Sequence, residues 1–218
     1  MKKEMSFQEF KKVYSENMEA YHKSMVSFPW EDVEAYKCWL AQTYYYVSFS
    51  SRIISLSAAL LPLSKSKLHS RCVTHSAEES NHEILAQRDL QALGGCIEDY
   101  PELPSTSALY QSQYFHCLND GADSLMGYFI SLEGLAIKSA SEAAQRVFKN
   151  LENPKAVNFL RVHGDEDIEH VEKAIDVLKS FSPVELYAAA KNLKRTREYY
   201  CQMLEECYSW SKEIGRAA

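Results

Sequence analysis

Helix-breaking residues are sparse in this chain, and their positions constrain its fold more than any other feature of the sequence. Only seven Gly and six Pro occur among 218 residues. Four of the Pro, at positions 62, 101, 104 and 154, lie between long segments whose apolar residues recur at helical spacing. A chain built from many short strands needs turn residues far more often. The pattern therefore predicts long helices joined by short connections.

Seven helical segments can be drawn from this punctuation. The third is expected to end at Gly94 and Gly95, because Gly commonly follows the last turn of a helix. No connection is long enough to separate domains, and no internal repeat is visible. We therefore predict a single all-α domain over residues 1–218. Its predicted helices span residues 6–24, 28–61, 65–93, 107–119, 123–149, 154–181 and 183–213.

The composition narrows the class of protein and its partners. The chain is 46% hydrophobic and carries a net charge of −6 without a basic block, which argues against nucleic acid as a partner. Six Cys without a CxxC pair indicate reduced thiols. The first residues lack the apolar run of a signal peptide, and no segment has the roughly 18 apolar residues of a membrane span. We expect a soluble cytoplasmic protein without membrane contact, for which a homodimer is one possible assembly.

The stretch "HGDEDIEH", residues 163–170, places polar groups where a helix should be apolar. His163, Asp167 and His170 are spaced i, i+4 and i+7, so they share one face, and the flanking apolar stripe runs along that same face. A solvated helix edge also carries His and Asp. Buried ionisable groups, however, are costly unless they are paired or bound to a metal. The pattern favours metal ligands on this helix.

The segment "HSAEESNHEILAQRDLQALGG" carries a second candidate pair of ligands. Glu79 and His82 are spaced i, i+3, whereas Glu78 and His82 are spaced i, i+4, so either carboxylate could share a metal with the imidazole. A carboxylate followed by His at i+3 recurs in helical bundles that bind two iron or manganese ions. Alone the signal is weak, because surface helices are rich in Glu.

Glu133 is the third unusual residue. It is the only acidic residue between Asp123 and Glu142, in the otherwise apolar or small stretch "DSLMGYFISLEGLAIKSA". Gly127 and Gly134 on the same segment would permit close helix packing. A buried carboxylate needs a partner, either a Lys or Arg from another helix or a metal. A metal would also explain the two segments above.

Together these segments supply three His and three carboxylates, which is an adequate set for two metal ions. Mixed imidazole and carboxylate ligands suit iron or manganese, whereas structural zinc more often recruits Cys. Each ion would keep open positions for small molecules. The predicted ligands are Glu79, His82, Glu133, His163, Asp167 and His170.

Read in order, "EESNHE…DLQALGG", "SLEGLA" and "HGDEDIEH" resemble the heme-oxygenase-like di-iron oxidases and oxygenases. That family includes the chlamydial protein associating with death domains, fatty-acid-decarboxylating enzymes and amino-acid-oxidising enzymes. The resemblance covers roughly residues 65–180. It implies a seven-helix heme-oxygenase-like bundle with two Fe(II)/Fe(III) ions per chain and O₂ as co-substrate. It also implies a peroxo-bridged diferric intermediate that oxidises a small amino-acid-derived or fatty-acid-like substrate, by C–H abstraction with C–C cleavage or by N-oxygenation.

The first-helix carboxylate of this family varies in its distance from the His. Glu79 is our choice here, with Glu78 and His75 as alternatives. Arg52, Arg161 and Lys138 are candidate anchors for a substrate carboxylate, because they lie near the predicted core helices.

Other residues open alternative functions. Tyr44, Tyr45 and Tyr46 lie on the second predicted helix, where a tyrosine near two irons could relay electrons or be consumed by a self-processing enzyme. His22 lies where heme oxygenases place an axial ligand, which would make the chain a heme-binding protein. Cys117 and Cys201 could be nucleophiles of a thiaminase-like relative, although a buried thiol is the commoner explanation.

Overall fold

The computed structural model describes residues 3–217, apart from the side chains of residues 165–170 and 214–217. No strand occurs in the described part of the chain, and the predicted all-α class is confirmed. The α-helices are, in chain order, α1 (Phe7–Ser27), α2 (Val33–Val47), α3 (Ser50–Leu60), α4 (Ser66–Glu78), α5 (Glu83–Ala92), α6 (Pro104–Asn119), α7 (Met126–Leu151), α8 (Asn158–Leu178) and α9 (Pro183–Ala217). Among these helices, none combines the length and apolar character that crossing a membrane requires.

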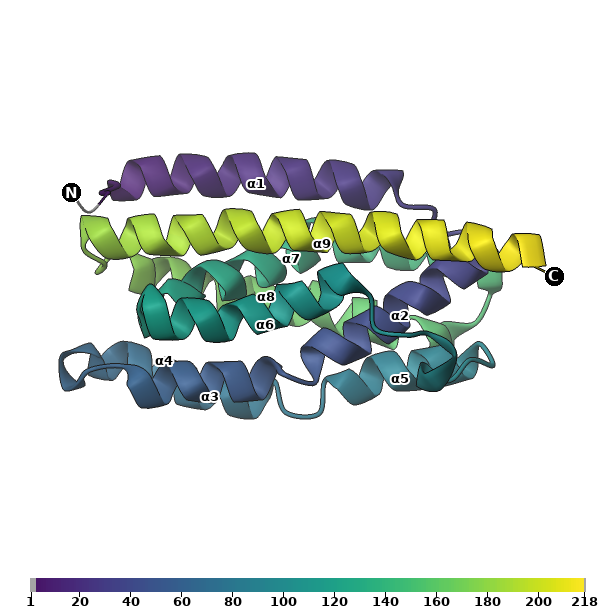
Figure 1. Cartoon of the computed structure of the whole chain (residues 1–218), viewed down its shortest axis with the longest axis horizontal. Coiled ribbons are helices and arrows are strands. Elements are labelled where there is room, and N and C mark those ends of the chain that lie inside the picture. Colours follow the sequence, from purple (N-terminus) through teal and green to yellow (C-terminus); the bar gives the residue numbers. More distant parts are fainter. Residues whose placement is uncertain (1–2, 218) are drawn as a thin grey trace.

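The helices form an elongated bundle (Figure 1). α1 and α9 lie side by side along one long edge, and α3 and α4 pair along the opposite edge. α7 packs against α1, α8 and α9, so it is the central helix of the bundle. α2 contacts α5 and α9. The first and last described residues lie at opposite ends of the long axis.

Two predicted helices are each divided in the structure. The second one breaks between α2 and α3, where the Ser48 hydroxyl donates to the Tyr44 carbonyl at 2.6 Å. The Phe49 amide then bonds to the Tyr46 carbonyl, three residues back, at 3.2 Å. Such side-chain bonds compete with the helix backbone and bend it. The Phe49 ring stacks on Tyr110 of α6 at 4.1 Å, so a tertiary contact accompanies the break.

The third predicted helix is divided into α4 and α5 by a turn over residues 79–82. Asn81 adopts a left-handed conformation with φ of 71°. Asn tolerates this region better than most residues do, but one such residue ends an α-helix. The single predicted helix over residues 65–93 is therefore wrong.

Glycine lets α7 approach its neighbours closely. A Cβ atom at Gly127 would overlap the backbone of Ala189 on α9, and one at Gly134 would overlap the Tyr14 side chain on α1. The expectation that these glycines permit close packing is confirmed. Glu133 is buried on the same helix, directly before Gly134, where α1 packs too closely to leave room for a side chain.

Side chains fix the starts of α1 and α2, and the cap of α2 serves as a control in an experiment below. Ser6 and Glu9 form a reciprocal capping box at the start of α1. Asp32 caps α2 by accepting from the amides of Glu34 and Ala35, both at 3.1 Å. By contrast, α8 starts at Val157 and Asn158 without a side-chain cap from its own sequence.

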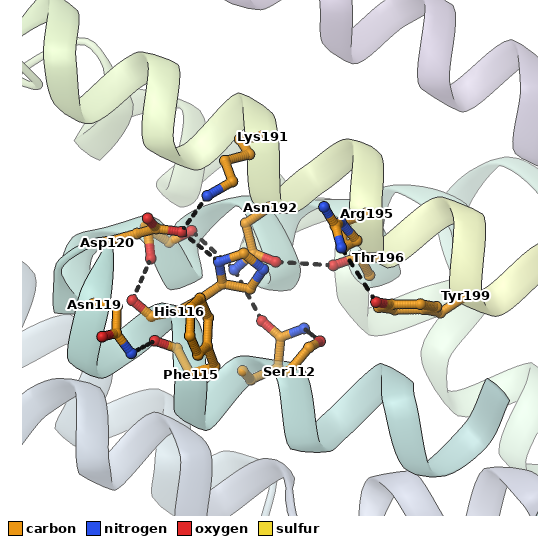
Figure 2. Close-up of polar contacts among 12 residues, drawn as sticks. Ser112, Phe115, His116, Asn119, Asp120, Lys191, Asn192, Arg195, Thr196 and Tyr199 are labelled. Carbon is orange, nitrogen blue, oxygen red and sulfur yellow. Dashed lines mark hydrogen bonds and ion pairs between the residues drawn. The ribbon is translucent and has the colours of Figure 1, made fainter. Parts of the chain in front are cut away.

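A buried polar network ties α6 to α9 (Figure 2). His116 and Lys191 both point at Asp120, with His116 Nδ1 at 2.6 Å and Lys191 Nζ at 2.8 Å from Asp120 Oδ2. Asn192 donates to the side-chain oxygen of Gln113 at 2.9 Å and to the Ser124 carbonyl at 3.2 Å. Ser124 belongs to the 3₁₀ helix Ala122–Leu125. We call these residues the α6–α9 network.

Candidate metal centre

Five ionisable side chains from four segments converge in the middle of the bundle. His75 lies on α4, and Glu79 immediately follows the end of that helix. His82 directly precedes α5, Glu133 lies on α7, and His163 lies on α8. His75 and Glu133 are buried, while the other three are half-buried.

Glu79 occupies the centre of this group because its two oxygens face different imidazoles. Its Oε1 lies 3.3 Å from His75 Nε2, and its Oε2 lies 3.6 Å from His82 Nδ1. His75 Nε2 is also 3.0 Å from Glu133 Oε1. One carboxylate therefore joins two His–carboxylate groups.

The second of these groups includes His163 of α8. One ligand atom each of Glu79, His82 and His163 lies within 4.8 Å of the others, close enough for one metal ion. The rings of His82 and His163 meet edge to face, with centroids 5.1 Å apart. His163 Nδ1 lies 2.9 Å from the Phe159 carbonyl, which can only accept a hydrogen bond. In the neutral ring the proton is therefore on Nδ1, and Nε2 keeps a lone pair for a metal.

Glu79 and His82 meet for a reason other than the one expected. The sequence prediction placed them one turn apart on a continuous helix, but the helix ends at Glu78. The turn at Asn81 brings the two side chains together instead. The proximity of the pair agrees with the prediction, whereas its helical explanation is corrected.

Glu78 and His75, the two alternatives to Glu79, have different environments. Glu78 is exposed and pairs with Arg71 at 2.9 Å, away from the cluster. His75 points into the cluster and contacts both carboxylates. Sequence reasoning ranked His75 low because its partner on α7 is far away along the chain. Only its i, i+4 spacing to Glu79 could have signalled the contact.

The other two predicted ligands, Asp167 and His170, lie outside the described residues. The backbone at both positions belongs to α8. They remain predictions from the sequence.

Electrostatics favours ionised groups in the cluster. Burial disfavours a charged His75, but hydrogen bonds to Glu133 and Glu79 outweigh it and raise the pKa of His75 to about 9. Burial also opposes ionisation of Glu79, yet the imidazoles of His75 and His82 hold the pKa of this carboxyl well below its usual range. Glu79 is therefore a carboxylate at neutral pH.

The donor set fits iron. Glu133 Oε2 is buried and has no hydrogen-bond partner among the described residues. A buried carboxylate oxygen without a partner is costly, and a cation would satisfy it. Imidazole nitrogens with carboxylate oxygens are ligands that suit iron and manganese.

A cavity of about 90 Å³ adjoins the cluster. Its lining includes His75, Glu79, Glu133 and His163, and it has room for several waters, since one water needs roughly 10–15 Å³. Most of the remaining wall is apolar, which is typical of sites for small organic molecules. Apolar side chains in the wall include Met25, Trp39, Ile54, Phe129, Leu135 and Leu160.

Of the three candidate tyrosines, Tyr46 lines the cavity, and so do Tyr128 and Tyr200, which sequence reasoning did not single out. Tyr45 instead donates to the Tyr100 carbonyl at 3.0 Å, and the Tyr44 ring packs against the Tyr45 ring. The hydroxyl of Tyr128 is buried, and this burial raises its pKa.

The residues behind the alternative functions lie elsewhere. His22 Nδ1 lies 3.3 Å from the Ser139 hydroxyl, and His22 is not among the described residues that line the cavity. Burial raises the pKa of the Cys117 thiol to about 11, which disfavours a reactive thiolate. Burial likewise raises the pKa of Cys201.

The three candidate anchors for a substrate carboxylate are exposed, namely Arg52, Arg161 and Lys138. Arg161 packs over the Phe148 ring, and Lys138 pairs with Glu19. Within the described part of the chain, none of the three lines the cavity.

Comparison with known proteins gives the fold a name. A domain of unknown function with a heme oxygenase-like fold from Shewanella denitrificans OS217 superposes with a TM-score of 0.85. The match has 17% sequence identity and covers 95% of each chain. The predicted heme-oxygenase-like fold is confirmed.

Two further solved structures share the fold. A TenA homologue from Pseudomonas syringae pv. tomato DC3000 has a TM-score of 0.74 at 12% identity, covering 94% of this chain and 96% of the other. A CADD-like protein of unknown function from Nostoc punctiforme PCC 73102 has a TM-score of 0.69 at 16% identity, covering 94% and 98%. At such identities the likeness shows the fold alone.

Sequence comparison is more specific. The model of a family described as iron-containing redox enzymes matches residues 37–198, a span that holds every predicted ligand. None of the curated protein sequences matches the chain.

Proposed function

Because the chain belongs to the family of iron-containing redox enzymes, we propose that it is a non-heme di-iron enzyme that uses O₂ to oxidise a small organic molecule. The observation that carries the proposal is the position of Glu79, whose two oxygens face two separate imidazole groups. A carboxylate that can bind two ions at once suits a two-metal centre in a helical bundle.

The described residues divide into two ligand groups. His82, His163 and Glu79 Oε2 would hold one ion. Glu79 Oε1, Glu133 and His75 would hold the other. Asp167 and His170, predicted from the sequence alone, would complete the ligand set from α8.

Iron in its ferrous state would supply the electrons that reduce O₂. The residues of the chain perform the remaining tasks. The Phe159 carbonyl keeps the proton of His163 on Nδ1, so that Nε2 is available as a ligand. The apolar wall of the cavity binds the hydrocarbon part of a substrate beside Glu79 and Glu133.

Iron stoichiometry tests the proposal directly. Anaerobic titration with Fe(II) should saturate at about two ions per chain, since two ligand groups are present. Glu79→Ala should bind at most one ion, because both groups use this carboxylate. Loss of O₂ consumption with the loss of iron should follow.

Glu78→Ala is the matched control, because it removes the adjacent, chemically identical side chain that pairs with Arg71 at the surface. This variant should keep both ions. Saturation of the wild-type protein at one ion, unaffected by Glu79→Ala, would contradict the two-metal centre.

A further inference from the structure

Asp89 of α5 supplies the cap that α8 lacks. Its Oδ2 accepts the backbone N–H of Phe159 at 2.8 Å, and its Oδ1 accepts the side-chain amide of Asn158 at 2.9 Å. Asp89 is fully buried, with 0% of its surface exposed. The first amides of a helix lack partners within the helix and lie at its positive end, so a carboxylate there is stabilising.

The capped residue leads directly to the candidate metal centre. The Phe159 carbonyl accepts from His163 Nδ1 at 2.9 Å. The two rings are also stacked, with centroids 4.1 Å apart and 27° between their planes. One residue therefore joins the Asp89 carboxylate to the imidazole of His163.

The start of α5 provides a second contact with α8. His82, immediately before α5, lies seven residues before Asp89, so the two positions are about two turns apart on the same side. The His82 ring meets the His163 ring at 5.1 Å. α5 thus contacts α8 both at a candidate ligand pair and at the start of the helix.

Burying the Asp89 carboxylate costs free energy, because its charged form loses contact with water. Burial raises the pKa of Asp89 to about 6, although its hydrogen bonds to Phe159 and Asn158 favour the charged form. No Lys or Arg of the described residues lies within ion-pair distance of it. Two hydrogen bonds to the first turn of α8 hold this carboxylate, and the charge of Arg161 adds an attraction over a longer distance.

We propose that Asp89 is a positioning residue of the metal centre: by capping α8 it holds Phe159, and through Phe159 it fixes the direction of His163 Nε2. The inference rests on the proposed role of His163 as an iron ligand. Residues that orient metal-bound His commonly influence metal affinity by about 10- to 100-fold.

Anaerobic Fe(II) titration of the full-length protein tests this role. Asp89→Ala should weaken binding of the His163-held ion by about 10- to 100-fold. Asp89→Asn should have a smaller effect, because the amide keeps one acceptor and turns a donor toward the other N–H. This variant preserves size, so it keeps the test valid if the alanine variant does not fold.

Asp32→Ala is the control. Asp32 caps α2 with the same chemistry, but α2 carries none of the candidate ligands. A second readout needs no metal: the imidazole ¹⁵N shifts of His163 should report one tautomer in the wild type and a mixture in Asp89→Ala. A cap that serves only stability would leave that tautomer unchanged.

The outcomes separate the two ideas. If Asp89→Ala and Asp32→Ala bind iron equally well and His163 keeps its tautomer, the positioning role is overturned while the metal centre stands. If the wild-type protein binds no Fe(II), the proposed function is overturned, and the role of Asp89 toward a ligand is overturned with it.

Discussion

Two clusters of largely buried polar groups, the α6–α9 network and the candidate metal centre, differ in how completely their described members are paired. In the α6–α9 network, His116, Asp120 and Lys191 form a chain of contacts, and Asn192 has a partner for each of its donated bonds (Figure 2). In the candidate metal centre, Glu133 keeps a buried oxygen without a partner among the described residues. Of these two clusters, the candidate metal centre alone adjoins the apolar cavity described above.

The difference shows how a structural polar cluster can be told from a functional one. Each cluster contains His and a carboxylate, so residue types alone do not distinguish them. A paired network stabilises and specifies the fold, whereas a buried carboxylate oxygen that lacks a protein partner is suited to binding a cation. Substitutions in the candidate metal centre should therefore change iron binding, and substitutions in the network should change stability.

The largest expected effect concerns iron. His163→Ala should reduce the Fe(II) content from about two ions per chain to one or fewer, because His163 is one of three ligands in its group. His116→Ala should leave the content unchanged. Metal analysis after anaerobic loading measures both, and an equal loss in the two variants would remove the distinction between the clusters.

The second effect concerns stability. Asn192→Ala should lower the free energy of unfolding by about 2–6 kcal/mol, since it leaves the Gln113 side-chain oxygen and the Ser124 carbonyl without this donor, at roughly 1–3 kcal/mol each. Urea unfolding of the metal-free protein measures this. Iron stoichiometry should not change, and a change would mean that the two clusters are coupled.

The third effect is a pH dependence of the metal-free protein. The pKa of His75 is about 9 in the folded state because hydrogen bonds to Glu133 and Glu79 outweigh its burial, against about 6.5 when unfolded. Since the folded pKa is raised, this stabilisation is complete below about pH 6.5 and is lost as the pH rises through 9. Urea midpoints of wild type and His75→Ala should therefore converge over this window. If the difference in urea midpoint between the two proteins stayed constant with pH, protonation of His75 would not contribute to folding stability.

The smallest effect belongs to the outer edge of the network. The Lys191 side chain is 40% exposed, so its ion pair with Asp120 is screened by solvent. Lys191→Ala should lower stability by about 1 kcal/mol or less. Thermal unfolding at low and high salt would show it, with the difference from wild type shrinking at high salt.

The sequence predicted those parts of the fold that depend on local signals. Pro154 and Pro183 mark the starts of two predicted segments, and α9 begins at the second of them. The predicted start of the fourth segment at Ser107 is wrong, because α6 begins three residues earlier at Pro104. The break between α2 and α3 could not be predicted, because it is accompanied by the stacking of Phe49 on Tyr110, which is distant along the chain.

The candidate site also combines residues that local sequence signals revealed with residues that depend on how the helices pack. Glu133 was recognisable because a lone acid in an apolar stretch conflicts with its surroundings. The contact of His75 with Glu133 depends on how α4 and α7 pack, which periodicity does not encode. Asp89 resembled any polar position of an amphipathic helix, because the amides that it caps belong to another helix.

The turn at Asn81 has a consequence for recognising such sites in other chains. In an unbroken helix, the separation of two side chains follows from their separation in sequence, so a motif with fixed spacing describes their geometry. Here the left-handed residue between Glu79 and His82 removes that correspondence. A related chain with one residue more or fewer in this turn could hold the same two groups together. A search by fixed spacing would overlook that chain, whereas a search by the distance between carboxylate and imidazole would find it.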